Sequence, residues 1–150
     1  MNLWIDLDID GLHNVIKNSD IFLLNDEEAM QLTEESDLMD AGKQLLSKGP
    51  TMVIIKMGAM GSTLITKNNI INIPCVPDIN VFDPTGAGDS FAGGLIGYMA
   101  KYGQDDMISA MLYASAIASF TVSGFGIDKI INLNLSEIKS RVEILRALIK

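Results

Sequence analysis

A loop of small residues beside an acidic side chain is the part of this sequence best suited to chemistry. Residues 83–89 read Asp-Pro-Thr-Gly-Ala-Gly-Asp and run directly into a stretch that predicts a helix. The first backbone N–H groups of a helix have no internal acceptor, and together with the helix dipole they attract anions. Gly86 and Gly88 let this backbone approach a phosphate closely because no Cβ intervenes.

Asp89 adds a carboxylate one residue after the last loop glycine. A carboxylate at this position can orient a hydroxyl that attacks the phosphate, or accept its proton. The segment therefore predicts the active-site loop of a kinase that phosphorylates an alcohol. A simpler interpretation stays open, because an acid in the first turn complements the helix dipole and glycine-rich loops are often only turns.

The glycines after Asp89 argue against a purely structural loop. If the helix continues past Asp89, then Gly93, Gly94 and Gly97 lie inside it. Three glycines cost a helix about 3 kcal/mol relative to alanine. Close helix packing or the close approach of a ligand must offset that cost.

Four motifs together resemble the ribokinase family, the PfkB-type kinases of carbohydrates and nucleosides. Residues 83–89 resemble its C-terminal signature, and residues 25–28 (Asn-Asp-Glu-Glu) resemble its Asn-x-x-Glu motif. Residues 53–62 are similar to the strand-turn-strand that lines its nucleotide site, and residues 118–126 to the helix end and loop beside the nucleotide. The resemblance implies an α/β, ribokinase-like layered fold of Rossmann type, with central parallel strands, a β-hairpin and helices on both faces.

The same resemblance implies an ATP-dependent phosphotransferase with Mg²⁺. Asp89 would be the catalytic base, and Gly86, Ala87 and Gly88 would donate N–H groups to the migrating phosphoryl group. Asn25 would lie near the phosphates and Glu28 near Mg²⁺, through water. The residues alone are better explained as a helix N-cap, Asn25, with Glu28 as its capping-box partner, and the two roles are compatible.

Lys56 ends an apolar segment, where a lone cation needs a partner. Contact with a phosphate and a salt bridge to an acid are equal alternatives for this side chain. The resemblance places Gly58 and Gly61 in the turn that lines the nucleotide site, Ser115 on the adenine side, and Gly124 in the loop beside the nucleotide.

A monovalent cation is a further expectation from the resemblance. Asp83 and Thr85, with the later loop at residues 123–126, correspond to the region that binds potassium in many relatives. Pro84 stiffens this region by restricting φ. Monovalent-cation activation is therefore a hypothesis for the intact enzyme.

Composition excludes some partners. The formal net charge is −8, which argues against nucleic acid because Lys and Arg drive that binding. The uncharged segment at residues 107–127 is long enough to span a bilayer, but its serines, glycines and many alanines favour a buried helix. Cys75 is the single cysteine, so it cannot form an internal disulfide, and a reducing, cytoplasmic location is expected. His13 is the single histidine, and we assign it no chemical role.

Alternating elements support the layered fold. Strands are predicted at residues 20–24 and 51–56, and a hairpin joins residues 62–66 to 70–73 through a turn at residues 67–69. Residues 11–18 are expected to be the end of a helix. Further helices are predicted at residues 26–32, 37–46, 87–102, 105–122 and 136–149, with Ser136 and Glu137 at the start of the last one.

We expect the chain to be one partial kinase domain over residues 1–150, carrying the nucleotide-binding and catalytic half without the N-terminal strands and lid that grip the acceptor. Unburied strand edges and helix faces then predict a homo-oligomer or pairing with a missing N-terminal half. The acceptor is a sugar or a nucleoside. A truncated, non-catalytic nucleotide-binding remnant and a purely structural adaptor are the alternatives.

Overall fold

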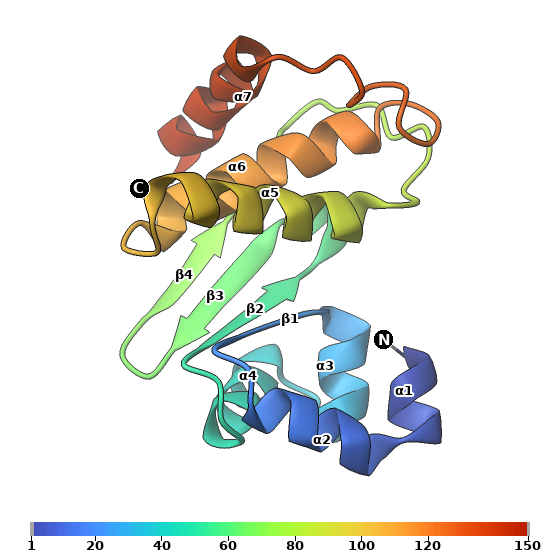
Figure 1. Ribbon diagram of the computed structural model, residues 1–150, viewed down its shortest axis with the longest axis vertical. Coiled ribbons are helices and arrows are strands. Elements are labelled where there is room, and N and C mark those ends of the chain that lie inside the picture. The colour runs from blue at the N-terminus through green and yellow to red at the C-terminus, as the bar shows by residue number, and fades with distance from the viewer. Residues whose placement is uncertain (1, 150) are drawn as a thin grey trace. The chain divides into compact units, whose positions relative to one another are not determined.

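The computed structural model describes residues 2–149, and its contacts form two compact units. The N-terminal unit extends to Asn72, and the C-terminal unit begins at Ile73. Figure 1 labels the helices and strands of each unit.

The N-terminal unit is built around a mixed four-stranded sheet in the order β1-β2-β3-β4 (Figure 1). β1 and β2 are parallel, whereas β2 and β3 are antiparallel. The parallel pair followed by a hairpin confirms the predicted α/β architecture. The elements in chain order are α1 (Asn2–Leu7), α2 (Ile9–Lys17), β1 (Ile21–Asn25), α3 (Asp26–Thr33), α4 (Leu38–Ser47), β2 (Met52–Lys56), the 3₁₀ helix η1 (Gly58–Met60), β3 (Ser62–Thr66) and β4 (Ile70–Ile73).

Hydrophobic patterning explains the strands of this unit. Phe22 and Leu24 alternate with half-buried residues along β1, as expected for a pleated strand with one buried face. β2 has consecutive buried residues, as parallel strands covered on both faces have. The core of this unit comprises Leu12, Ile16, Phe22, Leu24, Ala29, Leu32, Ala41, Leu45, Val53, Ile55 and Ile65.

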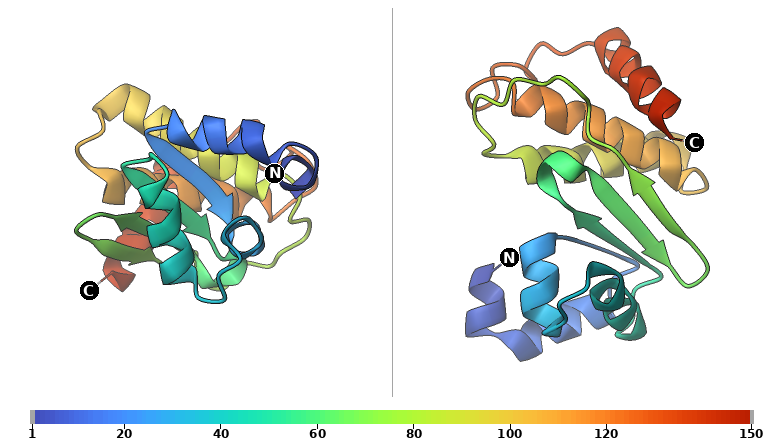
Figure 2. Two further views of the ribbon diagram at one scale, coloured as in Figure 1. Left: turned by 90° about the horizontal axis from the view of Figure 1, so that it is seen from below. Right: turned by 180° about the vertical axis from the view of Figure 1, so that it is seen from behind.

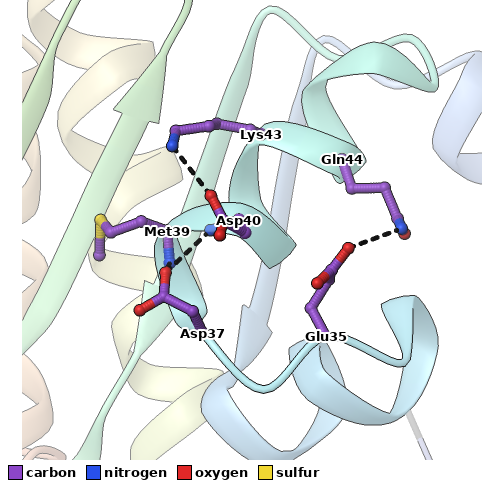
Figure 3. Close-up of polar contacts among 6 residues, drawn as sticks. All are labelled: Glu35, Asp37, Met39, Asp40, Lys43 and Gln44. Carbon is purple, nitrogen blue, oxygen red and sulfur yellow. Dashed lines mark hydrogen bonds and ion pairs between the residues drawn. The ribbon is translucent and has the colours of Figure 1, made fainter.

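Local capping sets the start of α4. Asp37 accepts hydrogen bonds from the Met39 and Asp40 N–H groups at 2.8 and 3.1 Å (Figure 3). Within the helix, Lys43 pairs with Asp40 at 2.9 Å. An acid at the N-cap satisfies donors that the first turn leaves open, so the sequence around Asp37 specifies where the helix begins.

The C-terminal unit contains α5 (Ala87–Tyr102), α6 (Met107–Thr121) and α7 (Leu135–Leu148). α6 packs against both α5 and α7, and Figure 2 shows α5 and α6 side by side. α6 is the most buried helix of the unit, which accounts for its apolar composition. Among the described residues, none of the helices combines the length and apolar character that a bilayer span requires.

The predicted elements agree with the structure to within one or two residues at most ends. Residues 62–66, 70–73 and 87–102 are elements with the bounds expected. The start of α7 differs, because Asn134 is the N-cap and accepts the Ser136 and Glu137 N–H groups. Glu137 returns a bond to the Asn134 backbone, so a capping box begins two residues before the predicted helix.

Candidate active site

Residues 83–88, here called the anion loop, form a tight turn that runs into the first residues of α5. Gly86 has φ +79° and ψ 0°, a left-handed conformation that favours glycine. The Ala87 N–H donates to Pro84 O at 3.2 Å, and the Ser90 N–H donates to Gly86 O at 2.9 Å. The N–H groups of Gly88 and Asp89 lie in the first turn of α5, where no intrahelical acceptor exists. The turn thus presents backbone donors at the positive end of a helix of 16 residues.

Asp89 lies in that first turn, and its side chain is exposed. The predicted base is therefore accessible from solvent beside the exposed backbone donors. Carboxylate and donors share one helical turn, which is the geometry that the sequence predicts for phosphoryl transfer.

Asp83 closes the entrance of the anion loop. Its Oδ1 accepts the Thr85 N–H at 2.9 Å. Hydrogen bonding by Thr85, from the backbone first and then the side chain, holds the pKa of the Asp83 carboxyl below its usual value. Asp83 is therefore a carboxylate at neutral pH, a hard oxygen ligand next to the loop.

The anion loop is tied to the end of α6. The N–H groups of Phe82 and Asp83 both donate to Val122 O, at 2.7 and 3.3 Å. Gly124 follows in the turn after α6, where its N–H donates to Thr121 O at 3.3 Å. The two segments that the resemblance assigns to a monovalent cation thus lie side by side in the C-terminal unit.

Ser115 and Gly124 are both buried, Ser115 within α6 and Gly124 in the turn after it. Ser115 stays a candidate for the adenine side of the nucleotide and Gly124 for the loop beside the nucleotide, although both are buried in the structure.

Asn25 and Glu28 form the capping box that the residues alone predict. The Glu28 N–H donates to Asn25 Oδ1 at 2.7 Å, and the Asn25 N–H donates to Glu28 Oε2 at 3.0 Å. Burial raises the pKa of the Glu28 carboxyl, but several contributions lower it, among them the hydrogen bond from the Asn25 N–H and, as the smallest, the charge of Lys56; the net pKa lies below its ordinary value. Glu28 is therefore a buried carboxylate at the start of α3.

Lys56 lies beside Asn25, because the two are register partners at the ends of the parallel strands β1 and β2. No ion pair within 4.0 Å joins Lys56 to an acid among residues 2–149. Of the two alternatives for Lys56, a direct salt bridge is therefore not formed with any acid of the described residues. The charge of Lys56 contributes to the lowered pKa of the Glu28 carboxyl.

The turn after β2 depends on two glycines. Gly58 has φ +54° and Gly61 has φ +92°, both in the region that favours glycine. The Gly61 N–H donates to Gly58 O at 3.1 Å, and the Met57 N–H donates to Gly61 O at 2.8 Å. A Cβ at Gly58 would meet no atom within 4 Å, so the conformation rather than crowding requires glycine there.

The candidate residues fall into two groups, each gathered within its own unit. Asn25, Glu28, Lys56, Gly58 and Gly61 belong to the N-terminal unit, where β1, β2 and η1 position them. The C-terminal unit holds Asp83, Thr85, Gly86, Ala87, Gly88, Asp89, Ser115 and Gly124.

Residues 2–149 contain no group of three or more His, Cys, Asp or Glu side chains placed to hold a metal ion. A single carboxylate is still compatible with Mg²⁺, which keeps several waters and takes further oxygens from phosphates. The ionised Glu28 fits that donor set. His13 instead lies 3.2 Å from Lys48 Nζ through its Nε2, and the side chain of Cys75 is half-buried.

Two hydroxyl groups that the sequence does not single out meet beside the anion loop. Thr121 Oγ1 donates to Ser90 Oγ at 2.7 Å and so links α6 to the first turns of α5. The two residues are 31 positions apart, and neither carries a local signal, so only the packing of the helices brings them together.

The glycines of α5 are only partly explained by packing. A Cβ at Gly94 would lie 3.0 Å from Ala114 Cα and from Ile117 Cδ1, so glycine permits the close approach of α6. Gly93 and Gly97 have no atom within 4 Å of the position of a Cβ. They line a cavity of about 380 Å³ in the C-terminal unit together with Tyr98 and Tyr113.

Comparison with known proteins relates both groups of residues to one family. Residues 2–131 match the pfkB family of carbohydrate kinases. The nucleoside kinase of Methanocaldococcus jannaschii is 43% identical over 75 residues, which are 49% of this chain and 24% of that protein. The ribokinase of Staphylococcus aureus is 31% identical over 112 residues, which are 71% of this chain and 36% of that protein.

A solved structure agrees with these matches. The crystal structure of a putative ribokinase II from E. coli, in complex with ATP and Mg²⁺, superposes with a TM-score of 0.77 at 30% identity, over 89% of this chain and 42% of that one. The chain thus spans less than half of this solved relative and 24% to 36% of the two curated ones. The matches confirm the resemblance to the ribokinase family that the four sequence motifs indicate. Since the family match covers most of the sequence, the chain belongs to the pfkB family of carbohydrate kinases.

Proposed function

We propose that this chain is the nucleotide-binding and catalytic part of an ATP-dependent kinase that phosphorylates an alcohol group of a sugar or a nucleoside. The observation that carries the proposal is the start of α5, where left-handed Gly86 is the N-cap of a helix whose first turn contains the exposed Asp89. Membership of the pfkB family supports it, as do relatives that are a nucleoside kinase and a ribokinase.

In this proposal Asp89 accepts the proton of the acceptor hydroxyl as the γ-phosphoryl group leaves ATP. The transition state is loose, so orienting the hydroxyl accounts for much of the benefit. The N–H groups of Gly86, Ala87 and Gly88 stabilise the charge that develops on the phosphoryl oxygens, and the Ala87 N–H is shared between a phosphoryl oxygen and Pro84 O. Small residues at these positions keep the backbone accessible.

The residues of the N-terminal unit serve the nucleotide. Mg²⁺, when bound, would neutralise phosphate charge, and the E. coli ribokinase II with ATP and Mg²⁺ supports its use. Glu28 would hold that ion through water, and Asn25 and Lys56 would contact the phosphates. Gly58 and Gly61 would let the turn after β2 pass close to the nucleotide, with Ser115 on its adenine side and Gly124 in the loop beside it.

Activation by potassium is part of the proposal. Asp83, Thr85 and the turn at residues 123–126 would supply oxygen ligands, and the bonds from Phe82 and Asp83 to Val122 O support this placement. A kinase assay of the intact enzyme in KCl against NaCl tests it. Faster phosphorylation in KCl is expected, and equal rates would rule the cation out.

The acceptor, the location and the assembly are also proposals. The named relatives include a nucleoside kinase and a ribokinase, so both acceptor classes stay in the proposal. We place the protein in the cytoplasm, acting as a homo-oligomer or with an N-terminal half. The second candidate function is a nucleotide-binding remnant without phosphoryl transfer. The assignment of the candidate residues favours this alternative, because most of them are assigned to the nucleotide and only Asp89 is assigned to the acceptor.

Isothermal titration with Mg·ATP tests the nucleotide site. Wild type and Asp89→Asn are both expected to bind, because the carboxylate acts on the acceptor. Gly88→Asp is expected to abolish binding, because it adds a negative charge at the backbone donors. Equal binding by wild type and Gly88→Asp would contradict the placement of the phosphates.

Circular dichroism and thermal unfolding of each variant provide the control for folding. A folded wild-type chain that shows no heat of binding would reject the nucleotide site in this chain. Binding without turnover, when sugars and nucleosides are screened as acceptors, would favour the non-catalytic alternative.

A further inference from the structure

The first turn of α5, which follows the anion loop, is joined to the end of α6 by a contact between two side chains. Thr121 Oγ1 donates to Ser90 Oγ at 2.7 Å, and its only other acceptor nearby among the described residues is Ile117 O at 3.4 Å. Thr121 is only 3% exposed. Water competes little for a hydrogen bond between buried hydroxyl groups. A buried hydroxyl group that loses its hydrogen-bond partner lowers the stability of the folded state.

The methyl group of the same residue faces the loop. A Cβ built on Gly86 would lie 3.8 Å from Thr121 Cγ2, so this methyl lies on the side of Gly86 where a side chain would project. Thr121 therefore lies close to Gly86, three residues before Asp89, and contacts Ser90, immediately after it. Within residues 2–149, Thr121 is the only residue outside residues 83–90 whose side chain forms a hydrogen bond with this segment.

The end of α6 is itself held by α7. The Arg141 guanidinium lies 3.4 Å from the centroid of the Phe120 ring, and its Nη1 donates to Ser119 Oγ at 2.6 Å. Burial lowers the pKa of Arg141 from its usual value, but a guanidinium stays charged at neutral pH. The turn that carries Thr121 is thus anchored from the side of α7.

We propose that Thr121, through its hydroxyl contact with Ser90, is a positioning residue that holds the anion loop and Asp89 in place at the end of α6. The proposal rests on the proposed function of that loop. Without the hydroxyl, the first turn of α5 opens more often, and its backbone donors and carboxylate lose their fixed arrangement.

Native-state amide exchange measured by NMR tests this contact without a ligand. The reporters are the N–H groups of Ala87 and Ser90, which donate to Pro84 O and Gly86 O. Thr121→Val keeps the shape and removes the hydroxyl, and it is expected to speed exchange at both amides about five- to tenfold, the effect of one hydrogen bond on local opening. Thr121→Ser keeps the hydroxyl and is expected to stay within about twofold of wild type.

Thr33→Val is the matched control. Thr33 is also a buried threonine at the end of a helix, but its hydroxyl donates to Ala29 O in its own helix at 2.7 Å. This variant should leave exchange at Ala87 and Ser90 unchanged. Exchange at Met111 and Leu112, buried in the middle of α6 of the same unit, separates a local effect from a general loss of stability in each Thr121 variant.

Two results would overturn the proposal: unchanged exchange at both reporters in Thr121→Val, or equal acceleration in Thr121→Val and Thr121→Ser, which would assign the effect to packing. If Thr121→Val does not fold, Ser90→Ala replaces it, with the same acceleration expected. In the double variant the two effects should not add, because either change removes the same bond.

Titration with Mg·ATP separates this proposal from the proposed function. If wild type binds, Thr121→Val is expected to weaken binding about five- to tenfold and Thr121→Ser to restore it. If wild type does not bind, the proposed function fails in this chain, while the exchange experiment still decides whether Thr121 holds the loop.

Discussion

Glu28 combines two kinds of chemistry in one side chain. Its Oε2 accepts the Asn25 N–H and so helps to begin α3, and its carboxylate is ionised next to the charge of Lys56. A structural cap needs only an acceptor, whereas a group that acts on Mg²⁺ needs the negative charge. Substitutions that separate acceptor from charge can therefore tell the two roles apart.

Glu28→Gln is expected to change the free energy of unfolding by less than about 0.5 kcal/mol, because the amide oxygen still accepts from Asn25. The same variant is expected to weaken the binding of Mg·ATP because it lacks the charge. Glu28→Ala should lose about 1 kcal/mol of stability as well as binding. Urea unfolding and titration measure the two effects, and full nucleotide affinity in Glu28→Gln would leave Glu28 with the capping role alone.

At the scale of the element, α5 shows how adjacent glycines differ in purpose. Gly94 faces the backbone of α6, whereas Gly93 faces open space. The intrinsic cost of glycine in a helix is the same at both positions, so the surroundings decide the effect of a substitution.

Gly94→Ala is expected to destabilise the protein by about 1–3 kcal/mol, because its Cβ would lie 3.0 Å from Ala114 Cα and force the helices apart. Gly93→Ala is expected to stabilise it by about 0.5–1 kcal/mol, since alanine restricts the unfolded chain and meets no atom. Urea unfolding of the two variants checks both signs. A loss of stability in Gly93→Ala would show that this position needs glycine for something other than helix packing.

The contribution of the α6 N-cap, Asp106, to the stability of the folded state depends on pH. Hydrogen bonding by Ser109, from its side chain first and then its backbone, holds the pKa of the Asp106 carboxyl below its usual value, and the N–H bond is 2.9 Å. A carboxyl with a lower pKa in the folded state stabilises it above the unfolded pKa. That contribution is lost as the pH falls through the folded pKa.

Asp106→Asn keeps a good N-cap without a titrating group. Wild type is expected to exceed this variant in stability by a few tenths of a kcal/mol at pH 7, and the difference should shrink below about pH 4. Unfolding with urea at a series of pH values measures it. A difference that does not change between pH 7 and pH 3 would show that the ionised form of Asp106 contributes nothing.

At the scale of the whole molecule, both units expose large apolar side chains. Trp4 and Leu7 are 58% and 70% exposed in the N-terminal unit, and Phe82 and Phe125 are 70% and 69% exposed in the C-terminal unit. Apolar surface of this kind marks sites of association.

We therefore expect the isolated chain to form oligomers, with a mass that rises with protein concentration. Static light scattering over a range of concentrations measures this. Double substitution of Phe82 and Phe125 by serine is expected to lower the mass if the C-terminal surface associates. A stable monomer of wild type at every concentration would contradict the prediction.

Local signals predict much of this protein from the sequence alone. The hairpin at residues 62–73, the helix at residues 87–102 and the capping of α3 by Asn25 follow from turn residues, spacing and side-chain acceptors close in sequence. The predicted start of α7 at Ser136 lies one residue after the observed start at Leu135, because Asn134 rather than Ser136 is the N-cap.

By itself, the sequence determined the family and the loop that carries the candidate chemistry, because glycines, an acid and a helix start express their preferences over a few residues. Only the tertiary structure decided which distant groups meet. The bond between Thr121 and Ser90, the approach of α6 to Gly94 and the place of Lys56 beside Asn25 arise from the packing and pairing of whole elements. Such contacts leave no mark in the spacing of residues, since they join parts of the chain whose separation in sequence is arbitrary.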